Sequence, residues 1–305
     1  MNKENKMDKK TEEVVDAKPT ETAVATVETT AVSTEVQVHG AQIEFPFLRI
    51  GQGMSQWKSD GKKPILGGWY LGRGKDSNLL VAGMGKDNGV FGIVLHKLDG
   101  FKEDRKWQAG LGAPRRWVIS GVKEDGTPIT ENDALEAAAK EGFTLAPRPT
   151  GEVWADTGRP KMRANLGRFC YLYMLIPLPQ DVDSDDYRVF PIGDKLYTPA
   201  RYEFDRQYYK QMDNILSNIR SRAEFAHRAD KGYKWSINGL VVHLYSAEAT
   251  NRDGIEFITS NFEKALRDGK PWEFTDEEKS DFAKFMMAAQ AGTTNVDEAM
   301  TDSEF

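Results

Sequence analysis

Short apolar or alternating runs, separated by Gly, Asp, Asn and Lys, follow one another from residue 41 onward. Such runs are typical of antiparallel strands joined by turns. They are IEFPFLRI, GGWYLGRG, NLLVAG and VFGIVLHKL in the first half, and GRFCYLYMLIPLP, YRVFPI, INGLVVHLYSAEA and IEFITSNF in the second. Their spacing predicts a small barrel or sandwich. GMGKDNG, residues 83–89, is interpreted as a hairpin turn between two of these strands.

Helical signals interrupt this strand pattern three times. TENDALEAAAKEG, with Thr130 as N-cap, predicts an inserted helix. Pro199 is expected in the first turn of a long helix, because apolar residues recur at helical spacing from Tyr208 to Ala226. Thr275 and Glu278 form a capping box before a C-terminal helix. We therefore expect a mainly β fold with helical insertions (α+β), most economically an OB-like Greek-key barrel.

Composition divides the chain into four parts. Residues 1–40 lack any aromatic side chain and predict a disordered leader. Residues 41–272 form the expected OB-like body with its helical insertions, and residues 273–290 the C-terminal helix. Residues 291–305 are expected to be an acidic, disordered tail.

Charge follows the same division. The chain has a net charge of −6 overall, but residues 1–40 hold five lysines and eight acidic residues, and residues 273–305 hold two lysines and nine acidic residues. The body between them is left with a net charge of +4. A basic body with acidic ends favours binding to a polyanion.

Membrane and secretory classes have no support in the sequence. The longest apolar run, CYLYMLIPLP, is half the length of a spanning helix, which needs about 20 residues. The N-terminal lysines precede no apolar segment of the kind that a secretory signal needs, so a cytoplasmic location is expected, in the host cell if the chain is encoded by a phage. Cys170, the single cysteine, lies in a strand-like run and is interpreted as a structural thiol.

Known catalytic motifs are absent from the sequence. GGWYLGRGKDS departs from a phosphate-binding P-loop at two positions, and the four histidines show no metal-ligand spacing. Asp181, Asp183, Asp185 and Asp186 could hold a divalent cation, or form a solvated loop, which is the favoured interpretation. We therefore expect no enzyme, no cofactor and no metal site.

Aromatic and basic residues are interleaved in three segments. A single-stranded nucleic acid needs cations for its phosphates and flat rings for its bases. The residues expected to bind it are Trp57, Trp69, Arg73, Lys75, Arg105, Lys106, Trp107, Arg115, Arg116, Trp117, Arg163, Arg168 and Tyr171. Trp69, Phe91, Phe169 and Tyr173 are equally compatible with a barrel core.

The acidic end of the chain finishes on an aromatic ring. The residues that define it are Asp297, Glu298, Asp302, Glu304 and Phe305. One reading is a solubilising tail, and another is a mimic of an anionic strand that occupies the binding groove until DNA displaces it.

Together, the basic aromatic body, the helical insertion and the ending MTDSEF resemble bacteriophage single-stranded DNA-binding proteins of the T7 type. The resemblance implies an OB-fold that coats DNA during replication, recombination and repair. It also implies a tail that recruits replication proteins such as DNA polymerase and primase-helicase.

The sequence therefore predicts a non-enzymatic single-stranded DNA-binding protein. A phage structural or virion-associated protein and a divalent-metal nuclease are the alternatives. A homodimer, and a preference for DNA over RNA, are left open.

Overall fold

The computed structural model describes residues 35–38, 41–52, 62–72, 78–105, 113–154, 156–180, 182, 187–250 and 254–291. Within these ranges the protein is mainly β with three α-helices, which confirms the expected α+β class. The first strands are β1 (Glu35–Val38), β2 (Ala41–Glu44), β3 (Phe47–Ile50), β4 (Trp69–Gly72), β5 (Asn78–Ala82), β6 (Val90–Glu103) and β7 (Arg116–Val118). The later strands are β8 (Arg148–Val153), β9 (Pro160–Arg163), β10 (Leu166–Pro177), β11 (Phe190–Ile192), β12 (Lys195–Asp205), β13 (Val241–Thr250), β14 (Glu256–Lys264), β15 (Leu266–Arg267) and β16 (Lys270–Pro271).

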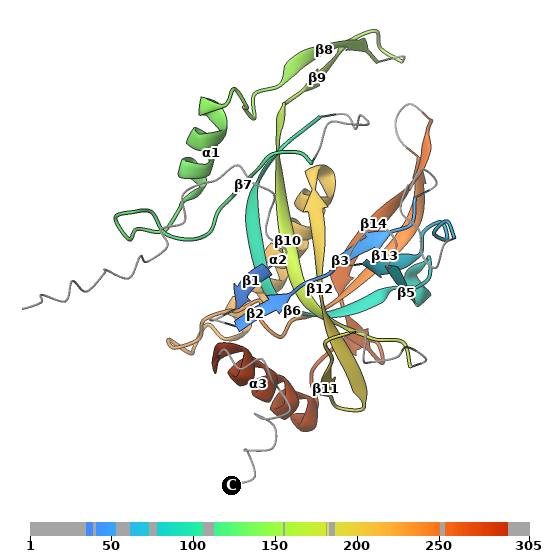
Figure 1. The fold of residues 1–305 in the computed structure, drawn as a ribbon, viewed down its shortest axis with the longest axis vertical. Helices are drawn as coiled ribbons and strands as arrows, with labels where there is room; N and C mark the ends of the chain where they lie inside the picture. The colour runs from blue at the N-terminus through green and yellow to red at the C-terminus, as the bar shows by residue number, and fades with distance from the viewer. Residues whose placement is uncertain are drawn as a thin grey trace, which may run out of the picture.

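One large curved sheet organises the molecule (Figure 1). Its strands follow the order β14-β13-β6-β10-β12-β3-β4-β5, with β7 added beside β6 and β11 beside β12. All neighbours are antiparallel except β12 and β3, which pair in parallel at Arg201 and Phe47. On one edge the long strand β6 has two neighbours: β13 pairs with its start and β7 with its end.

The two ends of the sheet approach one another without a strand ladder between them. Ser246 Oγ of β13 donates to the Gly67 carbonyl beside β4 at 2.5 Å, and the Gly85 N–H donates to the Ser246 carbonyl at 3.0 Å. Leu71 of β4 and Leu244 of β13 share one buried cluster. The sheet is therefore strongly curled, but among the described strands it does not close into a barrel.

Both faces of the sheet are covered, because β10 is apolar at nearly every position. Its odd-numbered residues from Phe169 to Leu175 belong to one core, and its even-numbered residues from Cys170 to Ile176 to another. This follows from the two-residue period of a strand. The helix α2 (Arg206–Ala226) covers the even side through Met212 and Leu216.

The other two helices have smaller contacts. The helix α3 (Asp276–Ala291) packs Phe285 and Ala289 on the odd side of the sheet. The helix α1 (Glu131–Lys140) buries Ala134 and Ala138 in a small third core with Trp117. Among the described residues, no helix combines the length and apolarity that crossing a bilayer requires.

Several sequence expectations are confirmed, and three differ from the structure. Thr130 caps α1, and Thr275 and Glu278 form the capping box of α3, with bonds of 2.8 and 3.2 Å. Pro199 does not begin a helix: it lies in β12 opposite Leu175, and α2 begins only at Arg206. On its other side β12 pairs with β11 before Pro199 and with β3 after it, so the missing N–H interrupts no described ladder.

The second error concerns residues 83–89. They hold a short 3-10 helix, η1 (Lys86–Asn88), and do not form a hairpin turn. The flanking strands β5 and β6 are not neighbours in the sheet, because β5 pairs with β4. Residues 35–38, expected to belong to the leader, form β1 and pair with β2.

Candidate nucleic-acid interface

Five neighbouring strands, β7, β6, β10, β12 and β3, place charged and aromatic side chains on one side of the sheet. Residues directly opposite in a ladder share a side, and the side chains alternate along each strand. The register therefore collects Phe47, Arg49, Lys102, Arg116, Phe169, Tyr171, Arg201, Glu203 and Asp205 on the same side. We call these nine residues the cation–aromatic face.

Two arginines flank one ring at the centre of this face. The Arg201 guanidinium lies 3.8 Å from the centroid of the Phe47 ring and 5.3 Å from that of Tyr171. The Arg49 guanidinium lies 5.4 Å from the same Phe47 ring. Arg201 is fully buried, whereas Phe47 and Arg49 stay partly exposed. A ring with two nearby cations suits an anionic, planar ligand.

The two arginines also repel each other. Burial and the positive charge of Arg201 both lower the pKa of the Arg49 guanidinium. A phosphate placed beside the pair would relieve this repulsion, because an opposite charge stabilises the charged form of each group.

The other half of the face is internally neutralised. Lys102 contacts Glu203 at 2.5 Å and also contacts Asp205, and Arg116 contacts Glu203 at 3.0 Å. Burial raises the pKa of Glu203, but Lys102 and Arg116 outweigh it and leave the pKa below its ordinary value. These cations are therefore held by carboxylates of β12.

Every predicted arginine in the described residues contacts a carboxylate. Besides Arg116, the pairs are Arg105 with Glu103 at 3.4 Å, Arg115 with Glu141 at 2.5 Å, Arg163 with Asp104 at 2.5 Å, and Arg168 with Glu131. Asp104 also accepts from Arg206 at the start of α2. Burial raises the pKa of Asp104, yet the two guanidinium groups bring it below its ordinary value. A phosphate would have to compete with these carboxylates.

The predicted rings in the described residues are closed to bases. Trp69, Trp117 and Tyr171 are at most 1% exposed. Trp69 packs against Tyr202 with ring centroids 5.2 Å apart, and the Trp117 Nε1–H donates to Glu141 at 3.2 Å. The expectation that these rings stack on bases is therefore wrong for this conformation. The core reading holds for Trp69, and likewise for Phe169 and Tyr173.

The remaining predicted residues lie outside the described residues. They are Trp57, Arg73, Lys75, Lys106, Trp107, the tail residues Asp297, Glu298, Asp302, Glu304 and Phe305, and the aspartates Asp181, Asp183, Asp185 and Asp186. Within the described ranges, no group of three or more His, Cys, Asp or Glu side chains is placed to hold a metal ion.

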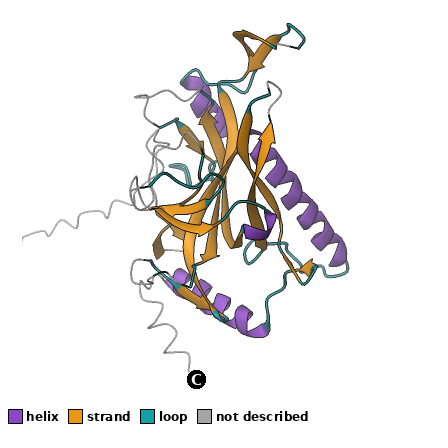
Figure 2. Ribbon diagram, turned by 90° about the vertical axis from the view of Figure 1, so that its right-hand side faces the viewer, coloured by secondary structure: helices purple, strands orange, loops and turns teal. Residues whose placement is uncertain are grey.

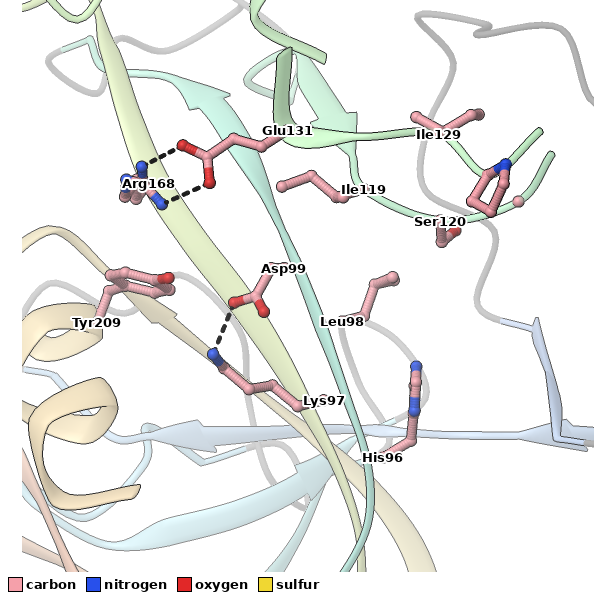
Figure 3. A pocket seen from close by; sticks show the side chains of 12 residues that line it. His96, Lys97, Leu98, Asp99, Ile119, Ser120, Ile129, Glu131, Arg168 and Tyr209 are labelled. Atoms are coloured by element: carbon pink, nitrogen blue, oxygen red, sulfur yellow. Dashed lines mark hydrogen bonds and ion pairs between the residues drawn. The ribbon is translucent and has the colours of Figure 1, made fainter. Parts of the chain in front are cut away.

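Arg168 lies at a pocket of about 530 Å³ between β6, the loop before α1, and α2 (Figure 3). Its ion pair with Glu131 lines the pocket, and so does the ion pair of Lys97 with Asp99 at 2.9 Å. Lys97 also contacts Asp213 of α2 at 3.1 Å. The cations that line this pocket are therefore already neutralised.

Of the nine residues of the cation–aromatic face, the predicted binding residues include only Arg116 and Tyr171, and Phe47, Arg49 and Arg201 are among those missed. Phe47 and Arg49 are two positions apart in FLRI, so strand alternation alone would have put them on one side. No local signal links them to Arg201, about 150 positions later, because the parallel pairing of β12 with β3 is a tertiary feature.

Comparison with models of protein families, with curated proteins and with solved structures finds no match to this chain.

Proposed function

We propose that the chain is a non-enzymatic single-stranded DNA-binding protein that holds its ligand at the cation–aromatic face. The observation that supports this most is the partly exposed Phe47 ring, with the guanidinium groups of Arg49 and Arg201 at 5.4 and 3.8 Å from its centroid. A base stacked at such a ring gains about 1–3 kcal/mol, and the partly exposed Arg49 guanidinium suits a phosphate beside it.

The curl of the sheet supports a binding scaffold of the OB type. OB-folds are five-stranded, partly open Greek-key barrels that bind strands on an outer face. Here the even side of β10 faces the core shared by both sheet ends and by α2, and the cation–aromatic face lies on the odd side, where α3 also packs.

We further propose that the acidic tail recruits replication proteins such as DNA polymerase and primase-helicase. The support is the sequence of residues 291–305, which holds four carboxylate side chains, no basic residue and a final Phe305. Deleting these residues should abolish partner capture and tighten DNA binding at low salt. Weaker DNA binding after truncation would contradict the idea that the tail competes with DNA.

The decisive experiment is a fluorescence-anisotropy titration of the full chain against single-stranded DNA, duplex DNA and RNA oligonucleotides. Single-stranded DNA should bind, with affinity that falls as salt rises at a log–log slope of about −0.7 per phosphate contact. Arg49→Gln and Phe47→Leu should each weaken binding at least about fivefold, the equivalent of about 1 kcal/mol. Lys195→Gln is the matched control, because Lys195 is an exposed cation remote from Phe47 in the sheet.

Three results would contradict the proposal. They are absence of binding to any oligonucleotide, affinity that does not depend on salt, and equal loss of binding in Lys195→Gln. Adding Mg²⁺ to the same samples tests the alternative of a nuclease, which would cleave the oligonucleotide.

A further inference from the structure

The second half of α2 and the segment after it form a basic surface that the helix does not need for packing. Tyr209, Met212 and Leu216 are buried, but from Arg220 to Ala226 no side chain is. In Figure 2 the long helix runs along one side of the sheet, and its last turns extend beyond the central strands. We call Arg220, Arg222, Phe225, Arg228, Lys231, Tyr233 and Lys234 the α2-end surface.

Positive charge is in excess on this surface. Residues 220–234 hold five Lys or Arg and two acidic residues. One of the acidic residues, Glu224, pairs with Arg220 at 2.7 Å, and the other, Asp230, accepts from the Gly232 N–H at 2.9 Å. Within the described part of the chain, Arg222, Arg228, Lys231 and Lys234 form no ion pair; these four are the available cations.

Aromatic rings accompany these cations. Phe225 is 66% exposed, and the Arg228 guanidinium lies 4.5 Å from its ring centroid. Next to it, His227 stacks on Tyr233 with centroids 4.2 Å apart and an interplanar angle of 16°. A large apolar ring held open to solvent beside a planar guanidinium is an arrangement on which a nucleic acid base can stack.

Helix stability does not account for the whole arrangement. Cations near a helix C-terminus interact favourably with its dipole, and Arg228 fits that role. The dipole effect falls off within the last turn, however, so it does not explain Lys231 and Lys234. It also gives no reason for an exposed Phe225, whose burial would be favourable.

We propose that the α2-end surface is a second contact for a nucleic acid strand, in which Phe225 stacks on a base and Arg222, Lys231 and Lys234 pair with phosphates. It is separate from the cation–aromatic face, because α2 packs on the even side of β10 and that face lies on the odd side. A strand that meets both surfaces passes around the sheet, so the protein covers more nucleotides than one face could.

The test compares wild type with a triple variant, Arg222→Gln/Lys231→Gln/Lys234→Gln, in the full chain. Anisotropy titrations over a salt series use oligothymidylates of about 10 and about 40 nucleotides. The matched control, Lys140→Gln/Lys195→Gln/Lys270→Gln, removes three exposed cations elsewhere and changes the net charge equally. All substituted side chains are exposed, so thermal unfolding should stay unchanged in both variants.

With the long oligonucleotide, the triple variant should bind about tenfold more weakly than wild type at low salt. Its log–log salt slope should be shallower by about 2, from three lost contacts at about 0.7 each. The control should move both quantities much less. Phe225→Ala should weaken binding about fivefold without changing the salt slope, since the ring contributes stacking and no charge.

The possible failures can be told apart. If wild type binds and Arg49→Gln weakens it, while the triple variant and Phe225→Ala match wild type, the α2-end surface is not a contact and the proposed function stands. If the triple variant loses binding to poly-glutamate but not to oligonucleotide, the surface fits an acidic protein and the inference is wrong. If wild type binds no oligonucleotide, both proposals are wrong.

Discussion

The cations that contact Glu203 and Asp104 differ from the cations of the α2-end surface in what surrounds them. At the sheet, Lys102, Arg116 and Arg163 each meet a carboxylate from a strand or segment distant in sequence. On the α2-end surface, Arg222 and Lys231 meet none within the described residues. A count of basic residues therefore says little about which cations a polyanion can reach, and partners contributed by the fold decide it.

The comparison also separates two uses of an arginine. In the sheet, burial makes an unpaired charge costly, so a carboxylate is retained beside it and the pair holds strands together. On the exposed helix end, water solvates the charge, and the side chain needs no partner until a ligand arrives. The first kind supports the fold, and the second is available for binding.

Removing the carboxylate of Glu203 in β12 should produce the largest change, a loss of folding stability. Glu203→Gln leaves Lys102 and Arg116 without the charge that both contact, so we expect the free energy of unfolding to fall by about 2–4 kcal/mol. Urea denaturation checks this. Glu124→Gln, at an exposed position, is the control. An unchanged midpoint in Glu203→Gln would mean that the sheet pairs do not support the fold.

Releasing the two arginines that contact Asp104 should have a smaller effect and should act on DNA binding. Asp104→Asn frees Arg163 and Arg206, so affinity for single-stranded DNA should rise roughly two- to fivefold, the equivalent of about 0.5–1 kcal/mol. Anisotropy titration measures it. Asp194→Asn removes an exposed carboxylate that has no described ion pair, and any gain that it shows is a net-charge effect. An equal gain in DNA affinity in the two variants would show that the ion pairs of Asp104 do not limit binding.

Low pH should remove the difference in unfolding free energy between wild type and Glu203→Gln. The folded-state pKa of Glu203 is lowered, so its contribution to stability is fully present above the ordinary pKa of 4.5 and is lost as pH falls through the folded value. The gap in unfolding free energy between wild type and Glu203→Gln should stay constant from about pH 7 to pH 5 and narrow below that. A gap that grew in acid would contradict the assignment.

The smallest effect is expected on the helix. Arg222→Gln should change the unfolding free energy by less than about 0.5 kcal/mol, because the side chain is exposed and holds no described ion pair. Urea denaturation alongside Glu203→Gln gives the direct contrast. A loss above about 1 kcal/mol would show that Arg222 supports the fold and would end the distinction drawn between the two regions.

Local signals predicted local structure well. The strand runs, the Thr130 cap and the Thr275–Glu278 box depend on neighbouring residues, and all are present. Pro199 misled because its fixed φ suits a helix start as well as a strand, and tertiary pairing with Leu175 selected the strand. The α+β class was therefore predictable, while the order of strands in the sheet was not.

The candidate site was less predictable than the fold. Arg116 and Tyr171, both expected to contact the ligand, lie on one side of the sheet, but Glu203, which neutralises Arg116, lies 87 positions away. Trp117 follows two arginines in sequence, yet the ladder with β6 turns it to the side of α1, opposite to Arg116, and the helix buries it. Interleaved charged and aromatic residues indicate the kind of ligand that a segment could bind. The side of the sheet on which each side chain lies depends on strand register.

The rate at which the thiol of Cys170 reacts with a labelling reagent reports how often the core around it opens. The thiol is fully buried in β10, and burial raises its pKa well above the ordinary value, so a thiol reagent cannot modify it in the closed sheet. As Cys170 is the single cysteine, each labelling event reports opening of the core between the sheet and α2 that buries it. Labelling rates with and without oligonucleotide would therefore measure how strongly a bound ligand holds this core closed.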